Sequence, residues 1–192
     1  MKYLLATTAL LLVAGTVFAQ QTPVGERPSW TQSDTWTWSD PAVHQLKHTV
    51  LAVAQDYYVA EIVAGSQRST STVDRDLHPK GNIVMQFQWP LSLDTNWKRT
   101  LTGAAPDGST GPWEITSVVE ASETVAIPAG SFDTFRIKGR HCNTKNNACG
   151  DFLMWYAPSA KFYVKFSWGT GYWPAAYRGA SRVLTSYQVH SP

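Results

Sequence analysis

The sequence predicts an all-β protein with a single domain, built as a curved antiparallel sheet or an open β-barrel of about ten strands. Two observations support this fold class. Short runs of alternating apolar and polar residues recur along the chain, and turn-forming residues separate them. Aromatic residues make up 12% of the chain and charged residues 16%, a composition that suits a large apolar core and not a disordered chain.

The N-terminal segment has the features of a secretory signal peptide. Lys2 precedes an uncharged, mostly apolar run from Leu4 to Phe18, and small residues stand at the usual positions before a cleavage site at Gln20. The run is shorter than the roughly 20 apolar residues that a membrane-spanning helix needs. We therefore expect residues 1–19 to be removed, leaving no transmembrane segment and an exported product that is periplasmic or secreted.

The remaining chain divides into two parts. Residues 20–33 are polar and contain two prolines and a glycine, which predicts a flexible leader. No linker or internal repeat interrupts the chain after it. We expect a β domain over residues 34–192.

The first expected strands lie early in this domain. Residues 35–38 alternate threonine and tryptophan, so both indoles should point to one face of a strand. The apolar-rich runs 43–54 and 57–63 flank Gln55 and Asp56 and predict a hairpin. A helix over 43–54 is the alternative, because its apolar residues also have helical spacing, but its β-branched content favours a strand.

The other strands follow with turns between them. Pro128 and Gly130 are placed for a tight turn, and a further turn is expected at residues 78–82. The expected strands are 69–73, 83–88, 97–102, 113–122, 124–127, 132–140, 152–156, 162–168 and 182–189.

Export would place the two cysteines, Cys142 and Cys149, in an oxidising compartment, where they predict one disulfide. The six residues between them are turn formers, so the bridge would close a loop. A redox or metal pair is the alternative. The spacing is not C-x-x-C, and His141 alone does not complete a zinc site.

Composition and motifs exclude several functions. A net charge of +2 leaves no basic excess for binding nucleic acid. No nucleophile elbow or phosphate-binding glycine loop is present. We expect no metal and no cofactor. A catalytic role is not favoured, although residues scattered in the sequence could still form a site.

Histidines and aspartates that could bear chemistry have plainer interpretations. We expect His44 and His48 to be exposed on a strand, too far apart to share a metal. Asp74 and Asp76 are typical of a charged turn and not of a calcium loop. His78 and His190 have no obvious partner in the sequence.

Aromatic residues near the C-terminus are the strongest unusual feature. On a strand over 162–168, the apolar residues at alternate positions share one face, and more aromatics follow in a glycine-containing segment. They either fill a β core or line an exposed surface for a lipid or a sugar. The candidate ligand-binding residues are Trp155, Phe162, Phe166, Trp168, Tyr172 and Trp173.

Three segments together resemble a family of uncharacterised bacterial exported β-proteins. Residues 89–97 contain P-L followed by a tryptophan, residues 123–135 contain P-A-G-x-F, and Trp155 begins W-Y-x-P, followed by a V-K pair. Asp94 stands at a usual glycine position, and residues 159–163 lack an expected glycine. The resemblance implies an envelope or periplasmic protein with a strongly curved antiparallel sheet, and it transfers no catalytic residue.

These observations give one leading hypothesis and two alternatives. The chain would be an exported, non-catalytic envelope protein that binds an apolar or amphiphilic molecule, or a partner, in a concave β face. Its partner would then be a hydrophobic small molecule or an envelope component. The alternatives are a glycan- or polymer-binding module that uses surface tryptophans, and a hydrolase with an unrecognised site.

Overall fold

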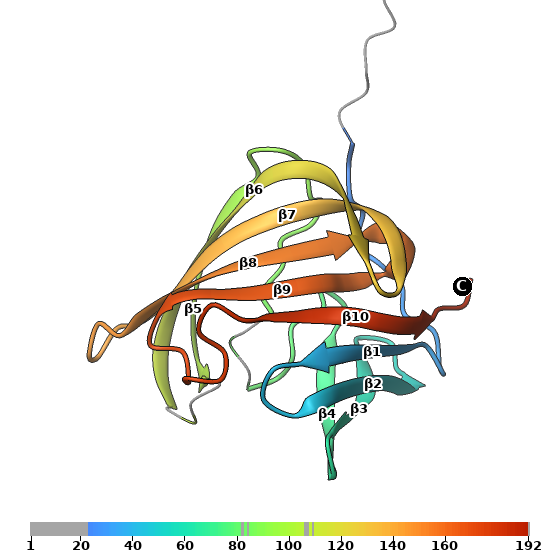
Figure 1. The fold of residues 1–192 in the computed structure, drawn as a ribbon, viewed down its shortest axis with the longest axis horizontal. Helices are drawn as coiled ribbons and strands as arrows, with labels where there is room; N and C mark the ends of the chain where they lie inside the picture. The colour runs from blue at the N-terminus through green and yellow to red at the C-terminus, as the bar shows by residue number, and fades with distance from the viewer. Residues whose placement is uncertain (1–22, 82, 84, 106–107, 109, 192) are drawn as a thin grey trace, which may run out of the picture.

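The computed structural model describes residues 23–81, 83, 85–105, 108 and 110–191, and it forms one ten-stranded antiparallel sheet (Figure 1). The strands are β1 (Thr35–Asp40), β2 (His44–Val53), β3 (Tyr57–Ala64), β4 (Gln67–Asp74), β5 (Asn96–Ala104), β6 (Thr110–Ile127), β7 (Gly130–Asn143), β8 (Cys149–Ala157), β9 (Phe162–Gly171) and β10 (Ser181–Gln188). Their order across the sheet is β4-β3-β2-β1-β10-β9-β8-β7-β6-β5. The expected signal peptide, residues 1–19, lies outside the described residues.

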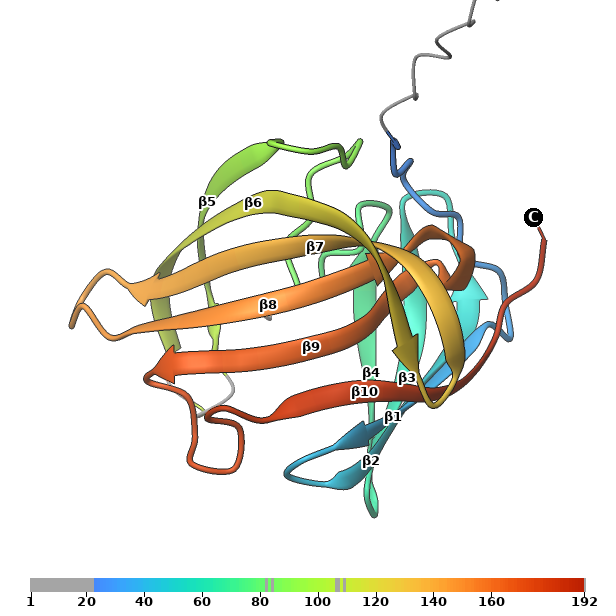
Figure 2. The same ribbon diagram turned by 45° about the horizontal axis from the view of Figure 1, so that its top comes forward.

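The predicted fold class is confirmed. The sheet stays open, with β4 and β5 at its two edges, and does not close into a barrel. In Figures 1 and 2, strands β5–β10 arch over one side of the molecule, and β1–β4 turn away beneath and behind them. The first and last strands of the chain pair at the centre of the sheet, because β1 lies between β2 and β10.

The structure confirms some of the predicted strands and corrects others. Residues 44–53 form β2, so the strand and not the helix is correct, and β2 pairs with β3 across the expected hairpin. The two expected strands 113–122 and 124–127 are one long strand, β6, with an irregularity between Val119 and Ala121. The predicted strand at 83–88 is wrong, because none of its described residues lies in a strand.

The error at 83–88 has a physical cause. Both Gln86 and Phe87 are buried, although strand alternation would send them to opposite faces. Their carbonyls accept hydrogen bonds from side chains instead of from a neighbouring strand: Trp97 Nε1 lies 2.8 Å from the Gln86 oxygen, and His78 Nε2 lies 2.8 Å from the Phe87 oxygen. The segment therefore packs as an irregular crossing between β4 and β5.

The hairpin of β6 and β7 reaches beyond its neighbours and curls towards β10 (Figures 1 and 2). The Ala129 N–H in its turn donates to the Leu184 carbonyl at 3.3 Å. The Phe132 and Tyr187 rings lie edge to face with centroids 5.5 Å apart. The hairpin tip thus contacts β10 on the side that β9 leaves uncovered.

Strands β9 and β10 pair only over residues 165–167 and 181–183. Beyond those pairs, three indole N–H groups donate to backbone carbonyls at and before the start of β9. Trp36 donates to Ala160 at 2.7 Å, Trp38 to Tyr163 at 3.2 Å and Trp30 to Lys161 at 3.0 Å. These bonds satisfy carbonyls that no strand reaches.

Aromatic side chains fill the inner face of the sheet. Trp36 and Trp38 are both fully buried, which confirms that the two indoles of β1 share a face. Trp30 is also buried and packs on Trp36 and Phe162, a contact that the expectation of a loose leader over residues 20–33 did not anticipate. A second contact of the leader lies at Gly25, whose backbone pairs with that of Leu91.

Cys142 and Cys149 face each other at the ends of β7 and β8, with their sulfur atoms at bonding distance. This agrees with the predicted disulfide that closes a loop. The residues between them form the turn of the β7–β8 hairpin.

A buried ion pair lies beside the core. Arg182 on β10 holds the fully buried carboxylate of Asp40, with nitrogen–oxygen distances of 2.6 and 2.7 Å. Asp40 also accepts two backbone N–H groups of the β1–β2 turn, from Ala42 and Val43. Arg182 in turn donates to the Tyr163 hydroxyl at 3.0 Å. Each charge thus has the partners that burial demands.

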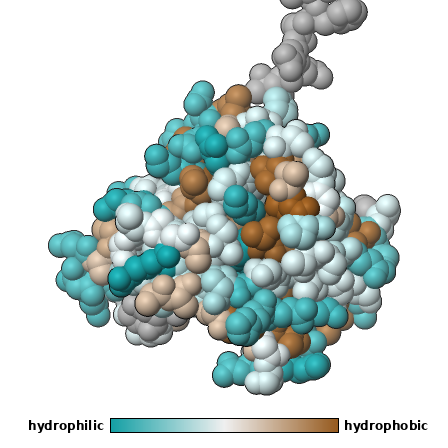
Figure 3. Space-filling model, in the orientation of Figure 1, coloured by the Kyte–Doolittle hydropathy of each residue, from teal (hydrophilic) through white to brown (hydrophobic). Residues whose placement is uncertain are grey.

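The outer side of the molecule is mixed in character. In the view of Figure 3 it is mostly hydrophilic or intermediate, with the largest hydrophobic area towards the hairpin end of β6 and β7 and smaller ones elsewhere. All nine tryptophans lie among the described residues; eight are buried and Trp89 is half-buried. No row of exposed indoles is therefore present in this part of the chain.

Trp36→Phe should lower the free energy of unfolding by about 1–3 kcal/mol, because the buried Ala160 carbonyl loses its donor. The cavity left by the smaller ring should lower it further. Urea denaturation followed by circular dichroism measures it. Trp89→Phe is the matched control, since its indole also donates to a carbonyl, Asp76 at 3.1 Å, but is half-buried. Water can replace that bond, so Trp89→Phe should lower the free energy of unfolding less than Trp36→Phe does. Equal losses in the two variants would contradict the role given to the Trp36 hydrogen bond.

Candidate functional site

The most distinctive cavity lies at the seam between the two sheet edges. Pro79 pairs with Val73 of β4, and the Lys80 N–H donates to the Thr72 carbonyl at 2.8 Å. The Gly81 carbonyl then accepts from Ala104 of β5 at 3.1 Å. This short segment bridges the edges, and beside it lies a cavity of about 410 Å³. It is lined by Tyr57, Thr72, Asp74, His78, Pro79, Lys80, Gly81, Gln86, Arg99, Leu101 and Thr102.

The Asp74 carboxylate organises the turn that follows β4. One oxygen accepts the backbone N–H groups of Asp76 and His78 at 2.9 and 2.8 Å. The other lies 3.1 Å from His78 Nδ1. Aspartate is favoured in such turns because its side chain can bind the backbone of residues just ahead. The expectation of a charged turn here is confirmed, and the turn fixes His78 against Asp74.

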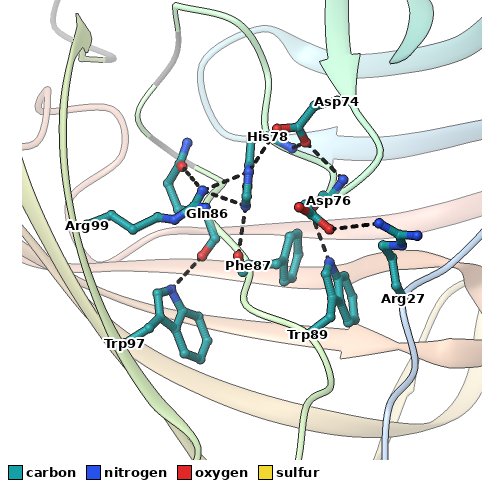
Figure 4. A network of polar contacts seen from close by, with 9 residues as sticks. All are labelled: Arg27, Asp74, Asp76, His78, Gln86, Phe87, Trp89, Trp97 and Arg99. Carbon is teal, nitrogen blue, oxygen red and sulfur yellow. Dashed lines mark hydrogen bonds and ion pairs between the residues drawn. The ribbon is translucent and has the colours of Figure 1, made fainter. Parts of the chain in front are cut away.

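Figure 4 shows His78 at the centre of a network of polar contacts. Its Nε2 lies 2.8 Å from the Phe87 carbonyl oxygen. Arg99 Nη1 is 2.7 and 2.9 Å from the two ring nitrogens, so the guanidinium lies against the imidazole and not in line with either nitrogen. The same Nη1 donates to the Gln86 side-chain oxygen at 3.1 Å. The sequence shows no obvious partner for His78; the structure places Asp74, Phe87 and Arg99 against its ring.

Tryptophans hold this network to the rest of the fold. Besides the bond from Trp97 to Gln86, the Trp89 indole donates to the Asp76 carbonyl. Asp76 also pairs with Arg27 of the leader at 3.4 Å. The crossing segment is thereby attached to β4, to β5 and to the leader, so the wall of the pocket is fixed from three sides (Figure 4).

The chemistry of the pocket favours binding over reaction. Each nitrogen of His78 faces an oxygen, so neither has a lone pair directed at a substrate. No serine, threonine or cysteine of the described chain is hydrogen-bonded to this ring in the structure. Two cations, Lys80 and Arg99, line the cavity, while the one carboxylate there is held by its own turn and by His78. An anion is the ligand that such a set of charges suits.

Two other cavities, of about 390 and 470 Å³, lie on the outer side of β6–β9. They share Lys138 and Asp151. Lys138 pairs with Glu120 at 3.6 Å, and Arg140 pairs with Asp151 at 3.0 Å. Because these charged side chains already pair with one another, the grooves offer less charge to a ligand than the seam does.

The aromatic residues chosen from the sequence lie in the core, away from the seam. Trp155, Phe162, Phe166, Trp168 and Trp173 are buried, and Tyr172 is half-buried. Trp155 donates to the Glu123 carboxylate at 2.7 Å, with the Lys165 ammonium over its ring. None of the six lines the seam cavity. Their role in ligand binding stays a prediction.

Two further histidines differ from expectation. His48 was predicted to be exposed, but it is buried among Trp38 and Phe162. Burial, helped by the nearby Arg182 charge, lowers the pKa of His48 to about 3. His190, for which the sequence shows no obvious partner, has its Nδ1 3.0 Å from the buried Asp34 carboxylate.

His141 is fully buried, and neither of its ring nitrogens has a hydrogen-bond partner among the described residues. It packs against the Phe152 and Trp173 rings. Burial lowers the pKa of His141 to about 3. Ser117, on the neighbouring strand, is also buried without a partner, so the two form no nucleophile–base pair.

Metal chemistry receives no support from the described residues. They contain no group of three or more histidine, cysteine, aspartate or glutamate side chains placed to hold a metal ion. In the same part of the chain, no helix has the length and apolar character to cross a membrane.

Comparison with protein-family models and with curated proteins gives no match. Among solved structures, the chain is similar to one from Bacteroides fragilis described as a putative exported protein with a YmcC-like fold. The two share 13% sequence identity with a TM-score of 0.44, over 88% of this chain and 100% of the other. At that level the likeness carries no inference about function.

The buried histidines predict a loss of stability in acid. Between pH 6.5 and about 3 the unfolded chain binds a proton at His141 that the folded chain does not, so the free energy of unfolding falls as pH falls through this range. The slope is up to about 1.4 kcal/mol per pH unit for each such group. His141→Phe should flatten the curve measured by urea denaturation from pH 7 to 4. Parallel curves for the two proteins would contradict the prediction.

Proposed function

We propose that this chain is an exported, non-catalytic protein that binds an anionic ligand in the seam pocket between β4 and β5. The signal-peptide features of residues 1–19 support export. One observation carries the ligand class: Lys80 and Arg99 both line a cavity whose single carboxylate is already held by backbone N–H groups and by His78.

The surroundings of Arg99 support this assignment. Its Nη1 is held by Gln86 and lies against His78, so the guanidinium has a fixed place before any ligand arrives. A guanidinium fixed in this way binds a carboxylate or phosphate with less loss of side-chain freedom than a mobile one. Lys80 is exposed and adds a second positive charge at the cavity. Thr72 and Thr102 add hydroxyls that can hydrogen-bond polar parts of the ligand.

The other sequence hypotheses have less support from the geometry. Packed aromatic side chains of the chain itself occupy the concave face, where an apolar ligand was expected. The glycan hypothesis required surface tryptophans, and eight of the nine are buried. For the hydrolase, no nucleophile among the described residues is hydrogen-bonded to His78 or His141.

Inorganic phosphate is the first probe. Titration followed by NMR or calorimetry should show saturable binding that weakens as salt rises, because charge attraction drives it. Lys80→Gln should raise the dissociation constant roughly two- to fivefold, the effect of losing one exposed charge contact of about 0.5–1 kcal/mol.

Lys98→Gln is the matched control. Lys98 precedes Arg99 on β5, so it faces the other side of the strand, where it pairs with Glu114 at 2.7 Å. Its removal should leave phosphate affinity unchanged. Equal weakening by both variants, or saturable binding of neutral glucose without phosphate binding, would rule out the anion pocket.

A further inference from the structure

The seam pocket borders an exposed apolar surface. Six large apolar side chains are exposed in the described part of the chain, and three of them, Leu51, Val53 and Tyr57, lie at the turn between β2 and β3. Their exposed fractions are 41%, 44% and 44%. Three exposed apolar side chains at one hairpin end are unusual for a protein with no partner there, because isolated apolar residues are the norm on soluble surfaces.

Sheet register connects Tyr57 of this group to the pocket. Tyr57 pairs with Asp74, and Val59 pairs with both Thr72 and Ala52. Residues paired in this way stand on the same face, so Tyr57 lies beside the pocket wall formed by Asp74 and Thr72. Val53 pairs with Tyr58 and therefore stands on the opposite face of the same hairpin end. Tyr57 therefore belongs both to the exposed apolar group and to the lining of the cavity.

The charges next to the apolar group are arranged for an anionic partner. Arg75 binds the turn itself, donating to the carbonyls of Ala54 and Gln55, and its guanidinium lies over the Tyr58 ring. Arg75, Lys80 and Arg99 are thus three cations near the end of the β2–β3 hairpin. The carboxylates nearby are Asp74, held by its turn, Asp76, paired with Arg27, and the exposed Asp56.

We propose that this end of the molecule docks on an anionic lipid membrane, with the lipid phosphate in the seam pocket and Leu51, Val53 and Tyr57 in the interfacial layer. The inference rests on the proposed function, because it names the source of the anion. Apolar burial and attraction between basic residues and anionic lipid add together in interfacial binding. Tyrosine, with an apolar ring and a polar tip, suits the level of the headgroups.

Sedimentation with vesicles tests the proposal. The protein should bind vesicles of phosphatidylglycerol mixed with phosphatidylcholine at least about tenfold more strongly than vesicles of phosphatidylcholine alone. A double variant, Leu51→Ser with Val53→Ser, should reduce binding about tenfold or more while leaving affinity for inorganic phosphate unchanged. Leu93→Ser is the matched control, because Leu93 is 40% exposed and does not line the pocket. It should bind vesicles as the unaltered protein does.

Two single variants examine the charges. Lys80→Gln should weaken vesicle binding, and Asp56→Asn should strengthen it by removing the exposed carboxylate of the turn. Thermal melting of each variant shows whether it folds. Vesicle binding that Lys80→Gln leaves unchanged would overturn the role of the pocket, and equal binding to both vesicle types would overturn the anionic requirement.

The outcomes separate the two proposals. Phosphate binding without vesicle binding overturns the membrane inference and leaves the anion pocket intact. If the protein binds neither phosphate nor vesicles, both the anion pocket and the membrane inference are overturned.

Discussion

Three indole N–H groups replace a missing strand along the start of β9, and the rest of the fold depends on this arrangement. Where β10 separates from β9, backbone carbonyls would be left unpaired inside an apolar core, at a cost of about 1–3 kcal/mol each. Trp30, Trp36 and Trp38 satisfy them. Each indole also buries a large apolar area, so the same side chains that fill the core allow the sheet to split. The split admits the tip of the β6–β7 hairpin, which contacts Leu184.

The two open edges of the sheet need a different solution. Edge strands expose unpaired backbone groups and invite association with other chains. Here the crossing segment covers part of both edges, at Thr72 and Val73 on β4 and at Ala104 on β5. Because that segment is irregular, its Gln86 and Phe87 carbonyls are satisfied by side chains, those of Trp97 and His78. The polar network that lines the seam pocket thus also holds in place the segment that joins the sheet edges.

The sequence is informative about strands and less so about this network. Alternation in residues 35–38 reports directly on one buried face, and the apolar-rich run 57–63 forms a strand as predicted. Alternation at residues 83–88 misleads, because these residues belong to an irregular crossing segment, where burial does not follow the alternation of a strand. His78 gives no local signal, since two of its partners, Phe87 and Arg99, are 9 and 21 positions away. Asp74, four positions before it, could have been noticed as a turn former whose side chain reaches His78.

The pairing of β1 with β10 has a consequence for how the molecule assembles. Asp40 and Arg182 are 142 positions apart, and β1 sits at the centre of the sheet with β10 as its neighbour. A ribosome releases β1 well before β10. Until β10 is made, β1 has no pairing strand on that side and Asp40 has no Arg182 to pair with. Contacts of such long range form slowly because loop closure precedes them. The molecule must therefore complete its centre last, and a chain shortened at its C-terminus would lose the middle of its sheet and not merely an edge.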